Sequence, residues 1–147
     1  MELMLIISVC LLSLFSCTFT KVNRTLNDID SFIMERPDSA LAVLESINRN
    51  DLGTARNKAH HALLYAMALD KNYIDVTDDS IAMVATEYYK KYGPRRNYAR
   101  SLYYLGKSYY YNKKYDKAIL EYSKAEKIAE GCDSLYLGMI YSAEGDT

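Results

Sequence analysis

The chain has 147 residues, about the length of one typical domain. Half of the residues are apolar, a quarter are charged and only two are Pro, so the composition excludes disordered, collagen-like and low-complexity proteins. The 18 Lys and Arg residues nearly balance the 19 Asp and Glu residues, so the net charge does not indicate a nucleic-acid or membrane partner. The 15 Tyr residues, with no Trp, are unusual for an enzyme core and more typical of helical repeats.

The N-terminal segment 3–19 is uncharged and mainly apolar, which is typical of an export signal. It contains a motif that resembles the lipobox of bacterial lipoproteins, Leu14-Phe15-Ser16-Cys17. This resemblance implies that residues 1–16 are a signal peptide, that Cys17 is acylated and becomes the new N-terminus, and that residues 17–24 are a linker. It places the protein in the bacterial cell envelope, lipid-anchored to a membrane on the periplasmic or surface side.

Two other interpretations of this segment stay open. Met1-Glu2 carries no basic residue, and the first positive charges, Lys21 and Arg24, follow the apolar stretch. By the positive-inside rule this bias favours an uncleaved anchor whose C-terminal side is cytoplasmic. A simple cleaved signal is the other alternative. Under the lipoprotein interpretation Cys132 is the one remaining free thiol, so we expect no internal disulfide.

Beyond residue 20 the apolar positions follow helical periodicity nearly throughout, and no alternating strand pattern of any length occurs. Capping and helix-breaking residues predict successive helices from Asn27-Asp28 to Arg36, from Pro37 to about 47, at about 54–71 after Thr54, from Thr77–Asp79 to Gly93, at about 95–111, at about 115–130, and from Asp133 or Ser134 onward. We expect Gly93 to adopt the left-handed conformation that often follows a helix. Short loops between such helices predict antiparallel neighbours.

One stretch, residues 99–132, resembles the tetratricopeptide (TPR) repeat through Leu102, Leu105-Gly106, Tyr109, Ala118, Tyr122 and Ala125. The spacing has a physical reason, because Gly106, Ala118 and Ala125 allow close helix approach and the Tyr side chains fill the space between the helices. Looser matches precede it, with Ala40, Leu44 and Ile47 in one repeat and Ala85, Tyr89 and Tyr92 in another. The resemblance implies an all-α fold over 25–147, with TPR-like antiparallel helix pairs stacked in a right-handed superhelical solenoid.

In the last predicted helix, the residues from Leu137 to Tyr141 resemble the beginning of the first helix of a further repeat, and Gly145-Asp146-Thr147 follow them. Solenoids normally end in a polar capping helix. We therefore expect the repeat domain to be truncated at its C-terminus, with a frayed terminal helix as the alternative.

The candidate binding residues are Arg100, Tyr103, Lys107 and Tyr110, which fall within an arc of about 80° on one helix. The TPR resemblance implies that these positions line a concave groove. Two cations and two phenols there suit a carboxylate or an acidic segment. Ordinary solvated positions on the helix surface are the alternative.

No pattern of catalytic or cofactor-binding residues occurs. His60-His61 are adjacent, so they diverge by about 100° on a helix and do not form a metal-binding pair. Glycine-rich phosphate loops and nucleophile motifs are missing, and we expect neither a metal, nor a cofactor, nor direct nucleic-acid binding by this segment.

The function that these observations favour is a lipid-anchored TPR scaffold that binds a protein or peptide without catalysis, and the two cations suggest an acidic ligand. Two alternatives stay open. In one, the repeats are the sensor half of a longer membrane-tethered transcriptional regulator or signalling protein. In the other, the protein is a glycan-binding lipoprotein, for which several Tyr in a shallow pocket with Asp or Asn between them would be the supporting sign.

Overall fold

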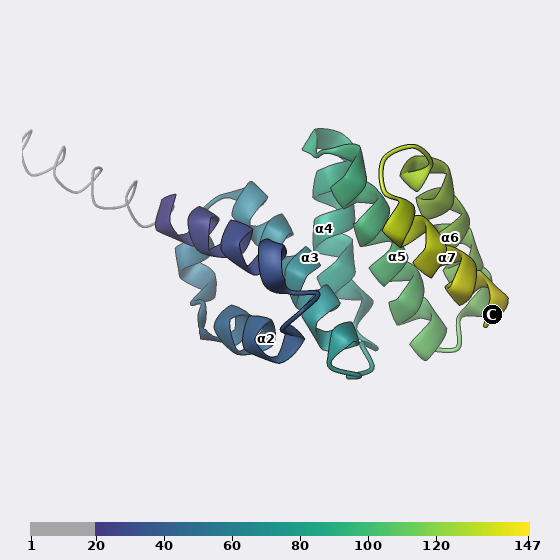
Figure 1. Ribbon diagram of the computed structural model, residues 1–147, viewed down its shortest axis with the longest axis horizontal. Helices are drawn as coiled ribbons and strands as arrows, with labels where there is room; N and C mark the ends of the chain where they lie inside the picture. Colours follow the sequence, from purple (N-terminus) through teal and green to yellow (C-terminus); the bar gives the residue numbers. More distant parts are fainter. Residues whose placement is uncertain (1–19) are drawn as a thin grey trace, which may run out of the picture.

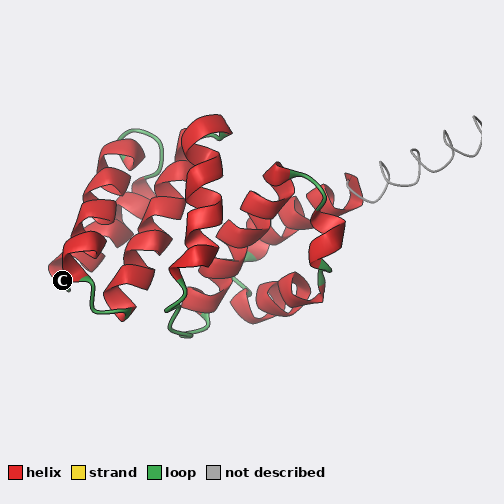
Figure 2. Ribbon diagram, turned by 180° about the vertical axis from the view of Figure 1, so that it is seen from behind, coloured by secondary structure: helices red, strands yellow, loops and turns green. Residues whose placement is uncertain are grey.

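The computed structural model describes residues 20–147, and within this range it contains helices and loops but no strand (Figures 1 and 2). A first helix covers 20–32. It is followed by α2 (Pro37–Ser46), the short 3-10 helix η1 (Arg49–Leu52), α3 (Ala55–Lys71), α4 (Asp79–Tyr92), α5 (Arg95–Tyr111), α6 (Tyr115–Ala129) and α7 (Ser134–Gly145). The prediction of an all-helical protein is confirmed.

Each helix from α2 to α7 packs against the next one along the chain (Figure 1). Two further contacts skip one helix, because α3 also touches α5 and α5 also touches α7. Among these helices, α2 has no such contact with α4, and α4 has none with α6. The helices α3, α5 and α7 therefore lie closer to one another than α2, α4 and α6 do.

Small side chains allow the helices to approach one another. Buried Ala residues occur on every helix from α2 to α6: Ala40, Ala59, Ala66, Ala68, Ala82, Ala85, Ala99, Ala118, Ala125 and Ala129. Larger apolar side chains such as Leu63, Met67 and Leu102 fill the space between them. At the α5–α6 contact Gly106 faces the ring of Tyr122, which is 1% exposed. This core matches native close packing, in which large and small side chains alternate.

Side-chain caps start several helices where the sequence predicts them. Thr54 accepts a hydrogen bond from the Asn57 amide at the start of α3, and Asp78 accepts one from Ser80 at the start of α4. Asp133 caps α7 by accepting from the Tyr136 amide, and it also accepts a 2.8 Å hydrogen bond from Nε of Arg96. Each cap satisfies an amide that has no partner within the helix.

Two predicted boundaries differ from the structure. The first helix does not begin at Asn27-Asp28, because residues 20–24, expected in a linker, are already helical. Leu26 and Ile29 along it, and Ile33 directly after it, are almost fully buried. Gly93 has φ −101° and ψ 169°, an extended rather than left-handed conformation. The following Pro94 explains this, because proline disfavours the helical region for the residue before it.

The expected signal peptide 1–16 and the acylated Cys17 lie outside the described residues. Within 20–147, no helix combines the length and apolar character needed to cross a membrane.

Candidate functional site

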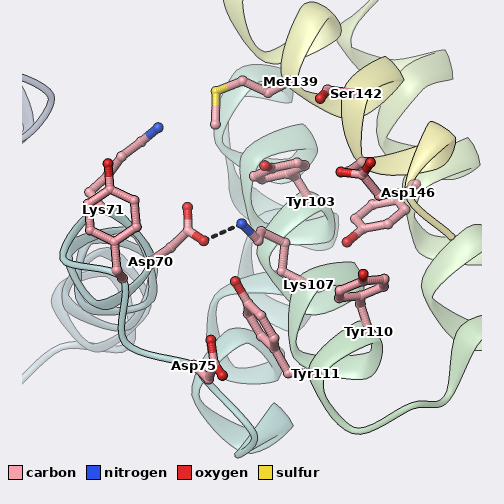
Figure 3. A pocket seen from close by; sticks show the side chains of 13 residues that line it. Asp70, Lys71, Asp75, Tyr103, Lys107, Tyr110, Tyr111, Met139, Ser142 and Asp146 are labelled. Carbon is pink, nitrogen blue, oxygen red and sulfur yellow. Dashed lines mark ion pairs between the residues drawn. The ribbon is translucent and has the colours of Figure 1, made fainter.

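A pocket of about 500 Å³ is lined by the C-terminal end of α3, by α5 and by α7 (Figure 3). Its volume falls within the range of small-ligand and side-chain pockets. The lining comes from α3 and the loop after it (Asp70, Lys71, Tyr73, Asp75), from α5 (Tyr103, Lys107, Tyr110, Tyr111), from α6 (Tyr122) and from α7 and its end (Met139, Ser142, Ala143, Asp146). Residues far apart in sequence therefore form one concave surface of Tyr rings and charged groups.

An ammonium group lies at the centre of this pocket. Nζ of Lys107 forms an ion pair with Oδ1 of Asp70, and it lies 5.9 Å from the Tyr103 ring centroid and 5.6 Å from that of Tyr111. Figure 3 shows the ammonium group facing Asp70 with a ring on either side. Carboxylates and aromatic faces both attract a cation, so Lys107 is held by three partners.

Burial and charge shift the ionisation of these groups. Burial alone would lower the pKa of Lys107, but the hydrogen bond with Asp70 and the charge interactions with Asp70, Tyr103 and Tyr111 together outweigh this effect and raise the pKa above its ordinary value. Burial raises the pKa of Tyr103 to about 12, despite the opposing effect of the Lys107 charge. Burial also raises the pKa of Tyr122. At neutral pH Lys107 is therefore charged, and the phenols of Tyr103 and Tyr122 are neutral.

Three of the four predicted binding residues, Tyr103, Lys107 and Tyr110, line this pocket. The fourth, Arg100, does not. Its residue is 3% exposed, and its Nη2 donates to Oδ1 of Asp30 at 2.8 Å while Nη1 donates to Oδ2 at 3.4 Å. Arg100 thus lies inside the molecule, one helical turn before Tyr103. Its charge is paired with the carboxylate of Asp30 on the first helix.

Arg100 belongs to a polar network that connects four helices. Its Nη2 also lies 3.0 Å from Sδ of Met67, and its guanidinium lies 5.3 Å from the ring centroid of Tyr136. The Tyr136 hydroxyl donates to the same sulfur at 3.4 Å and lies 3.1 Å from the Tyr104 hydroxyl. The network joins the first helix, α3, α5 and α7, and we assign it to stability rather than to ligand binding.

The His pair separates as expected for neighbouring helical positions. Nε2 of His60 lies 3.7 Å from Oδ2 of Asp30, whereas Nε2 of His61 forms a 3.0 Å hydrogen bond with the Leu44 carbonyl oxygen. Burial lowers the pKa of His61. Within 20–147 no group of His, Cys, Asp or Glu side chains is arranged to hold a metal ion. Cys132 is exposed, and its thiol donates to the Ile128 carbonyl oxygen.

Sequence reasoning missed the three carboxylates that line the pocket, those of Asp70, Asp75 and Asp146. Asp70 lies near the end of α3, and helical periodicity does not show that this end meets Lys107 of α5. Asp75 and Asp146 lie in a loop and beyond a helix end, where helical periodicity gives no direction.

Comparison with protein-family models, curated proteins and solved structures finds no match to this chain.

Proposed function

We propose that this protein is an exported, lipid-anchored TPR protein that acts as a non-catalytic scaffold and binds a protein or peptide in the pocket between α3, α5 and α7. One observation carries the proposal: Tyr103, Lys107 and Tyr110 of α5 line a single concave pocket together with residues from the end of α3 and from α7. The half-buried Tyr110 supplies apolar area with a polar tip, which suits peptide side chains.

The packing of alternate helices supports the solenoid part of the proposal. The helix α5 contacts both α3 and α7, whereas α4 and α6 do not contact each other. A curved array produces this pattern when the first helix of each pair lies on the inner face. The pocket is lined mainly by these inner helices, as a concave binding surface requires. A preformed surface of this kind loses little conformational entropy on binding.

A photo-crosslinking experiment tests the binding surface. We expect a photoreactive phenylalanine analogue at position 110 to crosslink the full chain to a discrete partner in its own cells. The same analogue at position 92, where Tyr92 is exposed outside the pocket, serves as the control. Tyr110 is half-buried at the pocket, so a bound peptide would lie within reach of it. Equal crosslinking from both positions, or none from 110, would contradict the proposal.

The lipid anchor has a separate test. We expect Cys17→Ser to move most of the protein from the membrane fraction to the soluble fraction, because acyl chains supply the hydrophobic binding energy of such an anchor. Cys10→Ser is the matched control, since Cys10 leaves with the signal peptide and its replacement should change nothing. If the Cys17→Ser protein stays in the membrane fraction, the apolar segment is an uncleaved anchor.

A glycan-binding lipoprotein is the second candidate, and one observation favours it. The pocket combines Tyr rings with carboxylates, and Tyr73 is 96% exposed at its edge, where a ring can stack on a sugar. Tyr103 and Tyr122, in contrast, are buried between helices and present little ring face. Saturable binding of an oligosaccharide, lost in Tyr73→Ala but kept in Tyr92→Ala, would establish this function in place of the first.

A further inference from the structure

The pocket of the proposed function carries an excess of negative charge, which bears on the kind of peptide it accepts. Its lining contains three carboxylates, those of Asp70, Asp75 and Asp146, and two ammonium groups, those of Lys71 and Lys107. The charge of Lys107 is already balanced by Asp70 in direct contact. An anion entering the pocket would therefore have to displace Asp70 and would also face the other two carboxylates.

The two cations that suggested an acidic ligand are both paired within the protein. Arg100 is turned inward to Asp30 and does not line the pocket, and Lys107 is turned to Asp70. Figure 3 shows Lys71 extending away from the Asp70–Lys107 pair. Separating a half-buried ion pair to bind an outside carboxylate costs the Coulomb attraction already present, so the gain from an acidic ligand is small.

Lys107 also shows which chemistry the pocket stabilises. The one ammonium group at its centre is held by a carboxylate and by the faces of Tyr103 and Tyr111. The remaining lining offers the same two kinds of group to a ligand: the exposed carboxylates of Asp75 and Asp146, and the half-buried ring of Tyr110. A guanidinium group suits both, because it stacks on aromatic rings and forms paired hydrogen bonds with a carboxylate.

We infer that the pocket between α3, α5 and α7 binds a basic segment of a partner protein, with Arg or Lys side chains directed to Asp75 and Asp146 and lying against Tyr110. This inference rests on the proposed peptide-binding function and reverses the charge of the ligand that the sequence suggested.

Nuclear magnetic resonance titration of the ¹⁵N-labelled full chain in a mild detergent tests the inference. The probes are three acetylated and amidated pentapeptides that differ only at two positions: Gly-Arg-Gly-Arg-Gly, Gly-Glu-Gly-Glu-Gly and Gly-Gln-Gly-Gln-Gly. We expect the Arg peptide to give saturable shifts at the amides of Lys107, Tyr110 and Tyr111, and to bind at least about tenfold more tightly than either other peptide. Raising the salt from about 50 to about 300 mM should weaken the binding, as charge screening requires.

Matched variants test whether the carboxylates of Asp75 and Asp146 are the groups that bind the Arg peptide. Asp75→Asn/Asp146→Asn should weaken the Arg peptide at least about tenfold, whereas Asp38→Asn/Asp51→Asn, which removes the same charge from exposed positions outside the pocket, should leave it unchanged. All four residues are exposed, so the amide spectrum of each variant should show an intact fold.

The possible outcomes separate the inference from the function on which it rests. Tighter binding of the Glu peptide at the same amides, or equal binding of all three, would overturn the basic-ligand inference and leave the peptide scaffold in place. If no peptide shifts these amides and maltose does, both are overturned in favour of a sugar ligand. If no probe binds the pocket, both are overturned.

Discussion

Replacing Asp30 with Ala is expected to lower the free energy of unfolding by about 3 to 5 kcal/mol, because it leaves a buried guanidinium charge without its partner. Arg100 is 3% exposed, and the side chain of Asp30 is 30% exposed above it, with two hydrogen bonds joining them. Small domains are stable by only about 5 to 15 kcal/mol, so this loss is a large part of the total. Urea unfolding followed by circular dichroism at the helical band measures it.

A double-mutant cycle distinguishes the ion pair from simple loss of packing. Arg100→Met should cost less than Asp30→Ala, because the carboxylate that it leaves behind can still reach solvent. The double variant Asp30→Ala/Arg100→Met should be clearly more stable than the sum of the two single losses predicts. Asp28→Ala, at an exposed position on the same helix, should change stability by less than about 0.5 kcal/mol. Similar losses from Asp28→Ala and Asp30→Ala would show that the pair is not formed.

The same pair gives a pH dependence. Burial alone would raise the pKa of Asp30, but the hydrogen bonds and charges of His60 and Arg100 hold it below its ordinary value of 3.8. A carboxyl whose pKa is lowered by folding stabilises the protein fully above its unfolded-state pKa, and this contribution declines as the pH falls toward the folded-state pKa. The difference in stability between the natural chain and Asp30→Ala should therefore shrink as the pH falls below about 4.

Local signals predicted most of the helix positions. The helix expected at 95–111 is observed as α5 (Arg95–Tyr111), because Gly93-Pro94 prevents an earlier start and the turn after Tyr111 ends it. Likewise α3 starts after Thr54, whose side chain supplies the predicted cap. The first helix begins earlier than predicted, and Val22 in its first turns packs against the core, a tertiary contact that the capping preference of Asn27 does not reveal.

The candidate site was predicted less completely, for a geometric reason. Helical periodicity placed Arg100 and Lys107 on one face of a helix, but it gave no information on which groups of other helices would meet them. Asp30 lies 70 positions before Arg100, and Asp70 is on a different helix from Lys107. Both partners approach through the contacts of α5 with other helices, so only the tertiary structure shows that the two cations are neutralised.

The second large loss of stability that we expect follows from replacing Gly106, where α5 and α6 approach each other closely. A Cβ added at Gly106 would lie 2.6 Å from Cδ1 of Tyr122 and still closer to Cε1. Contact this short forces a shift, and the Tyr122 ring, which is 1% exposed beside Tyr103, has little space to move. We expect Gly106→Ala to cost about 1 to 2 kcal/mol, since overpacking outweighs the better helix propensity of Ala. Gly106→Leu should cost more than about 3 kcal/mol.

Gly138 on α7 provides the matched control, because a Cβ added there meets no atom within 4 Å. Gly138→Ala should therefore stabilise the protein by about 0.5 to 1 kcal/mol through helix propensity alone. The opposite signs of the two Gly→Ala changes, measured by the same urea unfolding, separate steric crowding from backbone entropy. Tyr122→Leu should relieve much of the additional cost of Gly106→Ala, because the double variant removes the ring that the methyl group meets. If Gly106→Ala stabilises the chain as Gly138→Ala does, α5 and α6 are not in close contact at this position, and the spacing that resembles a TPR repeat has another origin.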